Sequence, residues 1–301
     1  MAEPTLEAAR NIIPMIRANL DKIDSDCQLP PDLAKTMNDA GLLRLYTPKV
    51  LGGPELDPIS AFHVVEEIGQ VDGSAGWCSF NGTALTASVS RITIEAAKEL
   101  FGEPPNVSAS GSARPQGTAK ATDGGYIVNG RWDYLSGVDH AKCLFLNCNV
   151  IDDNGPVLNE DGAPVFRVAV VPLDSGEMHI TWQTMGMRGT ASNDASFSDL
   201  FVPESHTYER TGAPYHDNPL YTPQTAILCS WTLAAANALG MARGAMEDFK
   251  RMATEGSTNS PTLMRDRTPT QTTVGECEAM IEAGRSYVLS AVGAMWESQL
   301  G

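Results

Sequence analysis

The chain has 301 residues, of which 42% are hydrophobic, and a formal net charge of −16. A chain of this length buries roughly three quarters of its unfolded surface, so one large domain or two to three smaller ones are expected. The negative net charge disfavours nucleic acid and anionic membranes as partners. Neither an export signal nor a stretch of about 18 consecutive apolar residues is visible, so we expect a cytoplasmic protein.

The first third of the chain is predicted to be helical. Apolar residues recur at helical spacing in 6–24, 59–77 and 93–102, and the run 30–45 begins with two prolines and reaches Gly41, where a helix C-cap belongs. His63 lies among apolar neighbours, so we interpret it as a packed core histidine.

The six cysteines show no C-x-x-C pair and no nearby pair of histidines. We therefore expect reduced, mostly buried thiols, with neither a disulfide framework nor a metal site. Cys143 and Cys148 are five positions apart in a strand-like run, which predicts that they lie on opposite faces of a sheet.

Near residue 105 the pattern changes from helix to strand. The stretch 108–132 is rich in Gly, Ser and Thr, and its "DGG" and "NG" sequences mark hairpin turns. Further strands are predicted in 142–151, 165–173 and 195–203, and the β segment ends near residue 212. The acidic loop 152–162 does not have EF-hand spacing and is interpreted as a solvated hairpin.

Two long helices are predicted in 226–253 and 270–298. Ala236, Gly240 and Gly244 recur every four positions, which indicates close contact with another helix. Two helices alone cannot cover each other's apolar faces, so this bundle must be completed by further sequence, by another subunit or by the N-terminal helices.

Self-association is expected on the same ground. Apolar helix faces near Leu233, Ala236 and Val288 would otherwise meet water.

Several segments together resemble the acyl-CoA dehydrogenase superfamily. They are "AGLLRLYTPKVLGGPELD", "GGYIVNGRWDYLSG", "MGMRGTASNDASFSDLFVPES" and "AAANALGMARGAMEDF", which occur in the family's order across nearly the whole chain. The resemblance implies an α+β fold that is mostly helical. Its parts would be an N-terminal helical domain (1–104), a central β-barrel-like domain (105–212) and a C-terminal helical bundle (221–301) that is truncated relative to the family.

The resemblance also implies a flavin site. In this fold a hydroxyl faces flavin N5, and the matching residue is Ser136, with Tyr134 stacked on the ring and Leu135 supplying backbone polar groups. From the local sequence alone, Ser136 would be a turn serine bonded to its own hairpin. Ser110 and Ser112 match the family's first flavin loop.

Arg265 and Arg267 lie in the loop where this family contacts a partner's cofactor phosphate. A role as ordinary surface-loop residues is the alternative for both.

Within the superfamily, "DGSAGW", "SGVDH" and "WQTMGMRGTASND" resemble flavin-dependent monooxygenases. Such oxygenase components take reduced FAD or FMN from a separate reductase and transfer oxygen to an aromatic or heteroatom substrate. Trp77, Phe80 and Trp182 would line the substrate pocket, or serve only as core aromatics. His140, four residues after Ser136, is a second catalytic candidate.

Two alternatives stay open. One is an acyl-CoA dehydrogenase using FAD, which needs a glutamate beside the flavin. In one branch of the family that glutamate lies early on the first long C-terminal helix, where this chain has Ser230. The other alternative is a catalytically incomplete member of the family.

Overall fold

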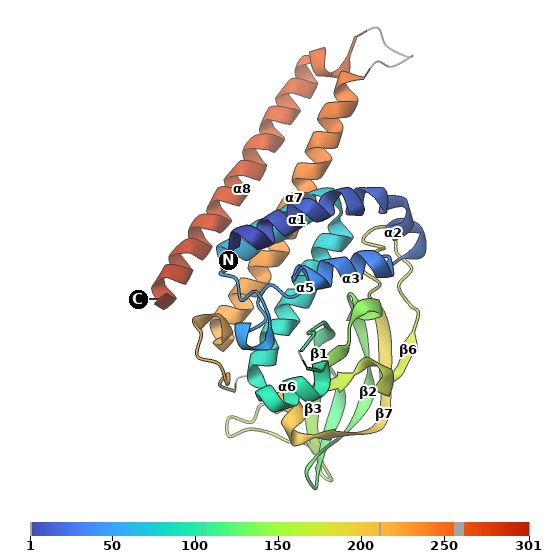
Figure 1. Ribbon diagram of the computed structural model, residues 1–301, viewed down its shortest axis with the longest axis vertical. Helices are drawn as coiled ribbons and strands as arrows, with labels where there is room; N and C mark the ends of the chain where they lie inside the picture. Colours follow the sequence, from blue (N-terminus) through green and yellow to red (C-terminus); the bar gives the residue numbers. More distant parts are fainter. Residues whose placement is uncertain (1, 104, 211, 256–261, 301) are drawn as a thin grey trace.

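The computed structural model describes residues 2–103, 105–210, 212–255 and 262–300, and the side chains from Thr5 onward. A cluster of helices lies against one twisted sheet, and two long helices, α7 (Pro223–Thr254) and α8 (Thr268–Leu300), form an antiparallel hairpin that packs on this cluster along part of its length and extends beyond it, away from the sheet (Figure 1). This mixed α+β architecture confirms the predicted fold class.

In the described residues the N-terminal part consists of helices, as predicted, but the single run expected in 6–24 is divided into two helices at Asn19. The helices are α1 (Ala2–Ala18), α2 (Leu20–Asp26), α3 (Pro31–Asp39), α4 (Pro58–Val71), α5 (Gly73–Ala87) and α6 (Ile94–Phe101). The single run expected in 59–77 is two helices, because Asp72 has an extended backbone and its side chain accepts the Ala75 N–H as the N-cap of α5.

The strands form one mixed sheet. They are β1 (Ala109–Thr122), β2 (Gly125–Leu135), β3 (Cys143–Asp152), β4 (Gly155–Pro156), β5 (Phe166–Pro172), β6 (Glu177–His179), β7 (Asn193–Pro203) and β8 (Thr207–Glu209). The order across the sheet is β6-β7-β2-β1-β3-β5-β8, and β4 pairs with β3. β2 lies antiparallel to β7, with Leu135 opposite Asn193, so the end of β2 meets the start of β7.

The sheet buries a separate apolar cluster on each face. Cys148 lies in a cluster with Trp132 and Phe197, whereas Cys143 lies in a cluster with Phe101 and other residues of the helical part. This confirms that the two cysteines point to opposite faces. All six cysteines are free.

Close packing against α4 determines the position of α7 (Pro223–Thr254). A Cβ added to Gly240 would lie 2.4 Å from the Glu66 carbonyl oxygen, and one added to Gly244 would lie 2.2 Å from that of Gln70. The small residues therefore allow the two backbones to approach, as predicted. Leu233 and Ala236 are fully buried in the helical core, which corrects the expectation that they form an uncovered face.

Helix α7 is long and apolar enough to cross a membrane, but the core helix of a folded domain can have the same length and composition. In this structure α7 contributes buried residues to the same apolar cluster as α4 and α5. We therefore interpret α7 as a core helix.

Helix α8 (Thr268–Leu300) is much less buried, and Val292 is its one buried residue among those described. The Arg285 guanidinium lies between α8 and α4, where it donates to both carboxylate oxygens of Glu66 and lies 3.3 Å from His63 Nδ1. His63 is therefore a partly exposed residue at a helix contact, which corrects its interpretation as a core histidine. Large apolar side chains on α8 are exposed at Met280, Tyr287 and Leu300.

The α4–α7 contact can be tested with one methyl group. We expect Gly240→Ala to lower the free energy of unfolding by about 1–3 kcal/mol, because the new Cβ has no room beside the Glu66 carbonyl. Gly275→Ala on α8 is the control: nothing lies within 4 Å of its Cβ position, so the better helix propensity of alanine should raise stability slightly. Urea unfolding followed by circular dichroism measures both variants, and equal effects would contradict the packing argument.

Candidate functional site

Ser136 lies where the sheet meets the helical part. Because Leu135 pairs with Asn193, the residues just outside the ladder, Ser136 after β2 and Ser192 before β7, come together. Their Oγ atoms are 2.8 Å apart, and Ser192 Oγ lies 2.7 Å from Thr190 Oγ1. A row of three buried hydroxyl groups results.

Helix α5 and strand β1 hold Ser136 from the other side. Trp77 Nε1 donates to Ser136 Oγ at 3.0 Å, and Asn81 Nδ2, one helical turn later, donates to the Ser136 carbonyl oxygen at 2.9 Å. Ser110 Oγ from β1 donates to the same carbonyl at 2.9 Å. Both the side chain and the backbone of Ser136 are therefore fixed. Ser136 itself is buried, with 7% of its surface accessible.

Tyr134 presents an aromatic ring beside this row. Its φ of +56° is in the left-handed region, which is unusual for a non-glycine residue, and 56% of its surface is exposed. The Trp182 ring lies edge-on to Tyr134 with 5.9 Å between centroids, and the Arg114 guanidinium lies 4.9 Å from the centre of the Tyr134 ring. An exposed aromatic ring held by strained backbone is typical of a ligand site.

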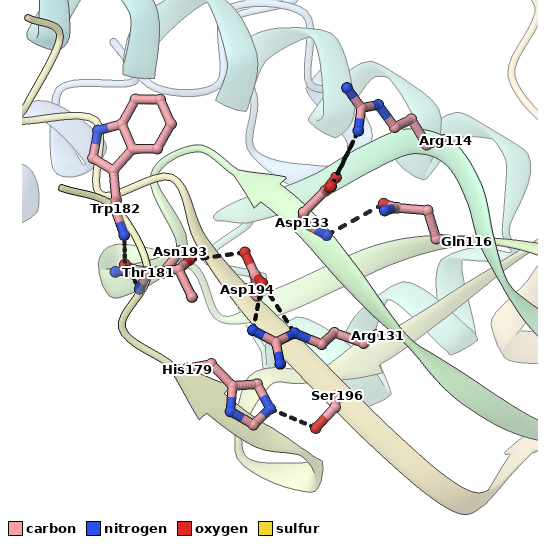
Figure 2. A network of polar contacts seen from close by, with 10 residues as sticks. All are labelled: Arg114, Gln116, Arg131, Asp133, His179, Thr181, Trp182, Asn193, Asp194 and Ser196. Carbon is pink, nitrogen blue, oxygen red and sulfur yellow. Dashed lines mark hydrogen bonds and ion pairs between the residues drawn. The ribbon is translucent and has the colours of Figure 1, made fainter. Parts of the chain in front are cut away.

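Ion pairs near the end of β2 join it to both neighbouring strands, β1 and β7. Asp133 pairs with Arg114 of β1 at 3.1 Å, and its backbone N–H donates to Gln116 (Figure 2). Arg131 pairs with Asp194 of β7 at 2.7 Å. The guanidinium above Tyr134 is thereby held in place.

Trp182 is oriented through its backbone and its indole. Asn193 Oδ1 accepts the N–H groups of both Thr181 and Trp182 at 3.1 and 3.0 Å (Figure 2). The indole Nε1 of Trp182 donates to the Met187 carbonyl at 2.9 Å. Met187 and Ala191 also have positive φ, of +53° and +44°, so the loop before β7 is strained on both sides of Thr190.

His140 follows on the short 3₁₀ helix Val138–His140. Its ring lies against Gly137, because a Cβ at Gly137 would be 2.9 Å from His140 Nε2. Burial lowers the pKa of His140 to about 4, so the imidazole is neutral and weakly basic at pH 7. Burial also raises the pKa of the Cys78 thiol well above its ordinary value, so Cys78 stays protonated. A catalytic role for His140 stays a prediction.

Three further predicted residues lie close to this region but in different environments. Phe80 is buried, and its ring packs edge-on to Trp77 with 5.0 Å between centroids. The Leu135 side chain is fully buried in the core of the sheet. Ser112 is also buried, and its hydroxyl lies 3.3 Å from Gln116 Oε1 within β1. The cofactor roles assigned to Leu135 and Ser112 stay predictions.

The structure does not bring Arg265 and Arg267 to the Ser136 region. Both lie in the connection between α7 and α8, at the end of the helix hairpin that is farthest from the sheet (Figure 1). Within one chain they belong to another surface, and only a second copy could join them to such a site.

Sequence reasoning missed Asn81, Ser192 and Thr190. Asn81 follows Trp77 by one helical turn, and Ser192 and Thr190 lie inside the "RGTASND" segment. These residues are therefore close to the candidate motifs in the sequence, but the sequence does not show which way their side chains point. Within the described part of the chain, no group of three or more His, Cys, Asp and Glu side chains could hold a metal ion.

Comparison with protein families gives two matches. Residues 7–103 match the acyl-CoA dehydrogenase N-terminal domain, and residues 232–300 match the acyl-CoA dehydrogenase C-terminal domain. Together the two matches span more than half of the chain.

Two individual proteins are similar to this chain over most of its length. Indole-3-acetate monooxygenase of Pseudomonas putida is 29% identical over 94% of this chain and 71% of its own length. The oxygenase subunit HsaA of a flavin-dependent monooxygenase of Mycobacterium tuberculosis is 31% identical over 81% of this chain and 62% of its own length. The chain thus spans between about three fifths and seven tenths of these relatives.

Among solved structures, the crystal structure of 3-HSA hydroxylase from Rhodococcus sp. RHA1 superposes with a TM-score of 0.88, at 25% identity, over 99% of this chain and 77% of that chain. The two proteins therefore share the same overall fold. The chain belongs to the acyl-CoA dehydrogenase family, and within it is similar to the oxygenase components of flavin-dependent monooxygenases.

Proposed function

We propose that this protein is the oxygenase component of a two-component flavin-dependent monooxygenase that hydroxylates an aromatic or heteroatom substrate. The observation that carries the proposal is Ser136, which is held between α5 and the ends of β2 and β7 and has Tyr134 exposed beside it. The names of the relatives support the reaction class and an aromatic substrate.

The residues present fit a reduced flavin, FAD or FMN, supplied by a separate reductase. Tyr134 offers an exposed ring for stacking, and Ser136 Oγ, which accepts one hydrogen bond from Trp77, keeps a second lone pair for a ligand. When bound, the reduced flavin would supply the two electrons that activate O₂, of which one oxygen atom would enter the substrate and the other would leave as water. Arg114, beside Tyr134, is a cation suited to an anionic ring or phosphate.

The chain's own residues would orient the reactants and exclude water. Trp77 donates to Ser136 and Trp182 contacts Tyr134, so two of the three aromatic residues proposed to line the substrate pocket touch residues proposed to hold the flavin. The third, Phe80, packs edge-on against Trp77. Their apolar surfaces favour an aromatic substrate and a dry site.

An acyl-CoA dehydrogenase is the second candidate. The position where one branch of the family has its glutamate is Ser230, whose hydroxyl donates to the Ala226 carbonyl of its own helix at 2.7 Å. This serine cannot remove an α-proton as a carboxylate would. Position 230 therefore favours the oxygenase over that branch of the dehydrogenases.

A homodimer or homotetramer is proposed as the assembly, and the cytoplasm as the location. The exposed apolar residues of α8, Met280 and Tyr287, support association with a second copy. In such an assembly Arg265 and Arg267 would serve the neighbour's cofactor phosphate.

The proposed reaction predicts oxygen incorporation. We expect the protein, given reduced flavin by a flavin reductase and supplied with ¹⁸O₂, to incorporate one ¹⁸O atom into a phenol or an indole derivative, as measured by mass spectrometry. A parallel sample with oxidised FAD and an acyl-CoA, kept free of oxygen, should keep its flavin absorbance near 450 nm. Bleaching of that absorbance by the acyl-CoA, with no labelled product, would favour the dehydrogenase.

Removal of the Ser136 hydroxyl should affect both stability and coupling. Ser136→Ala leaves the Trp77 N–H without its acceptor, so we expect a loss of about 1–3 kcal/mol in the free energy of unfolding. The ratio of hydroxylated product to hydrogen peroxide should fall by about two- to tenfold, because one hydrogen bond near the reacting flavin is lost.

Ser198→Ala is the matched control for Ser136→Ala, since Ser198 lies exposed on β7. It should change neither the unfolding free energy nor the product ratio. Unchanged coupling in Ser136→Ala would remove Ser136 from the proposed site.

A further inference from the structure

Four hydrogen bonds run in one line through the Ser136 region. Trp77 Nε1 lies 3.0 Å from Ser136 Oγ, which lies 2.8 Å from Ser192 Oγ. Ser192 Oγ lies 2.7 Å from Thr190 Oγ1, which lies 2.9 Å from the Met187 carbonyl oxygen. We call Ser136, Ser192 and Thr190 the hydroxyl chain.

The two ends of this line determine the direction of every hydrogen bond in it. An indole N–H can only donate and a carbonyl oxygen can only accept, whereas each hydroxyl group has one proton. Thr190 gives its proton to the Met187 carbonyl, so it must accept from Ser192. Ser192 has then used its proton, so Ser136 must donate to Ser192.

Water cannot easily replace these bonds. The accessible surface is 7% for Ser136, 4% for Ser192 and 1% for Thr190. A hydroxyl proton without a partner in such a place is costly, so the arrangement that satisfies all four bonds is preferred. Ser136 therefore has its proton engaged and one lone pair free.

We propose that Thr190 and Ser192 are positioning residues that make Ser136 a hydrogen-bond acceptor toward the flavin, and so select the reduced over the oxidised cofactor. The inference rests on the proposed flavin site. Reduced flavin carries a hydrogen on N5 and donates there, whereas oxidised flavin has a bare N5 that can only accept. An acceptor facing N5 thus distinguishes the two redox forms.

Counting bonds gives the size of the effect. A donor at N5 adds one bond to Ser136 and leaves the hydroxyl chain intact. An acceptor at N5 requires Ser136 to turn its proton away from Ser192, which reverses the chain and removes the Thr190–Met187 bond. The Met187 carbonyl stays satisfied by Trp182 Nε1 at 2.9 Å, so the difference is one hydrogen bond, or about two- to tenfold in affinity.

The test is the ratio of the dissociation constant of oxidised FAD to that of reduced FAD, each measured by titrating the protein with the cofactor. The titration with reduced FAD is done without oxygen, and FMN is titrated in the same way. In Thr190→Val the Ser192 proton loses its acceptor and becomes free to point to Ser136, so that Ser136 can donate to oxidised N5. We expect the ratio of the oxidised to the reduced constant to fall by about two- to tenfold. Thr190→Ser keeps the hydroxyl group and should restore the ratio.

Thr86→Val is the matched control, because Thr86 is fully buried and its hydroxyl donates to a backbone carbonyl, that of Thr83, outside the hydroxyl chain. It should leave the ratio unchanged even if it lowers stability. Ser192→Ala interrupts the chain at another point and should lower the ratio as Thr190→Val does, which keeps the test decisive if one variant fails to fold.

The outcomes separate this inference from the proposed function. If the unmodified protein binds flavin but Thr190→Val and Ser192→Ala leave the ratio unchanged, the positioning role is overturned and the flavin site stands. If the variants change the dissociation constants of both redox forms by the same factor, the two residues act only on the structure of the site, which also overturns the inference. If the unmodified protein binds neither form, the proposed flavin site fails and the inference fails with it.

Discussion

The pairing of β2 with β7 is the constraint on which the candidate site depends. Because Leu135 lies opposite Asn193, Ser136 and Ser192 meet just beyond the ladder, although they are 56 positions apart in the chain. A slip of one residue in this register would turn each side chain to the other face of the sheet and separate the two hydroxyl groups. Helix α5 then fixes Ser136 through Trp77 and Asn81, so the same serine also joins the sheet to the helical part.

The position of α5 depends in turn on how the helices pack. Gly69 and Gly76 leave room for the Asn237 side chain of α7, and Gly240 lets α7 approach the backbone of α4. Burial of apolar side chains from α4, α5 and α7 in one cluster supplies the main stabilisation of this part. The contact of α8 with α4 instead includes the ion pair between Arg285 and Glu66, and most of its surface is exposed. The packing of α7 against α4 and α5 thus positions the helix that carries Trp77 and Asn81.

Strain is concentrated where the loop before β7 meets the end of β2. Tyr134, Met187 and Ala191 all have left-handed backbone, and in each case the surrounding hydrogen bonds hold the conformation. This arrangement exposes one aromatic ring and buries three hydroxyl groups beside it. A site formed in this way is largely preorganised, because its polar groups are already oriented by one another.

The sequence by itself determined the fold class and the local elements. Helical periodicity, hairpin glycines and the spacing of Cys143 and Cys148 are local properties, and the structure agrees with each of them. The sequence also identified Ser136 and Tyr134 as candidate site residues, because the motifs that contain them occur in the order typical of the acyl-CoA dehydrogenase family. Only the tertiary structure decided that Leu233 is buried and that His63 lies at a helix contact. It also decided that Asn81 and Ser192 bond to Ser136 and that Thr190 bonds in turn to Ser192. The physical reason is that strand register and helix packing join residues far apart in the chain, and the direction of a hydroxyl proton depends on every donor and acceptor that these contacts bring together.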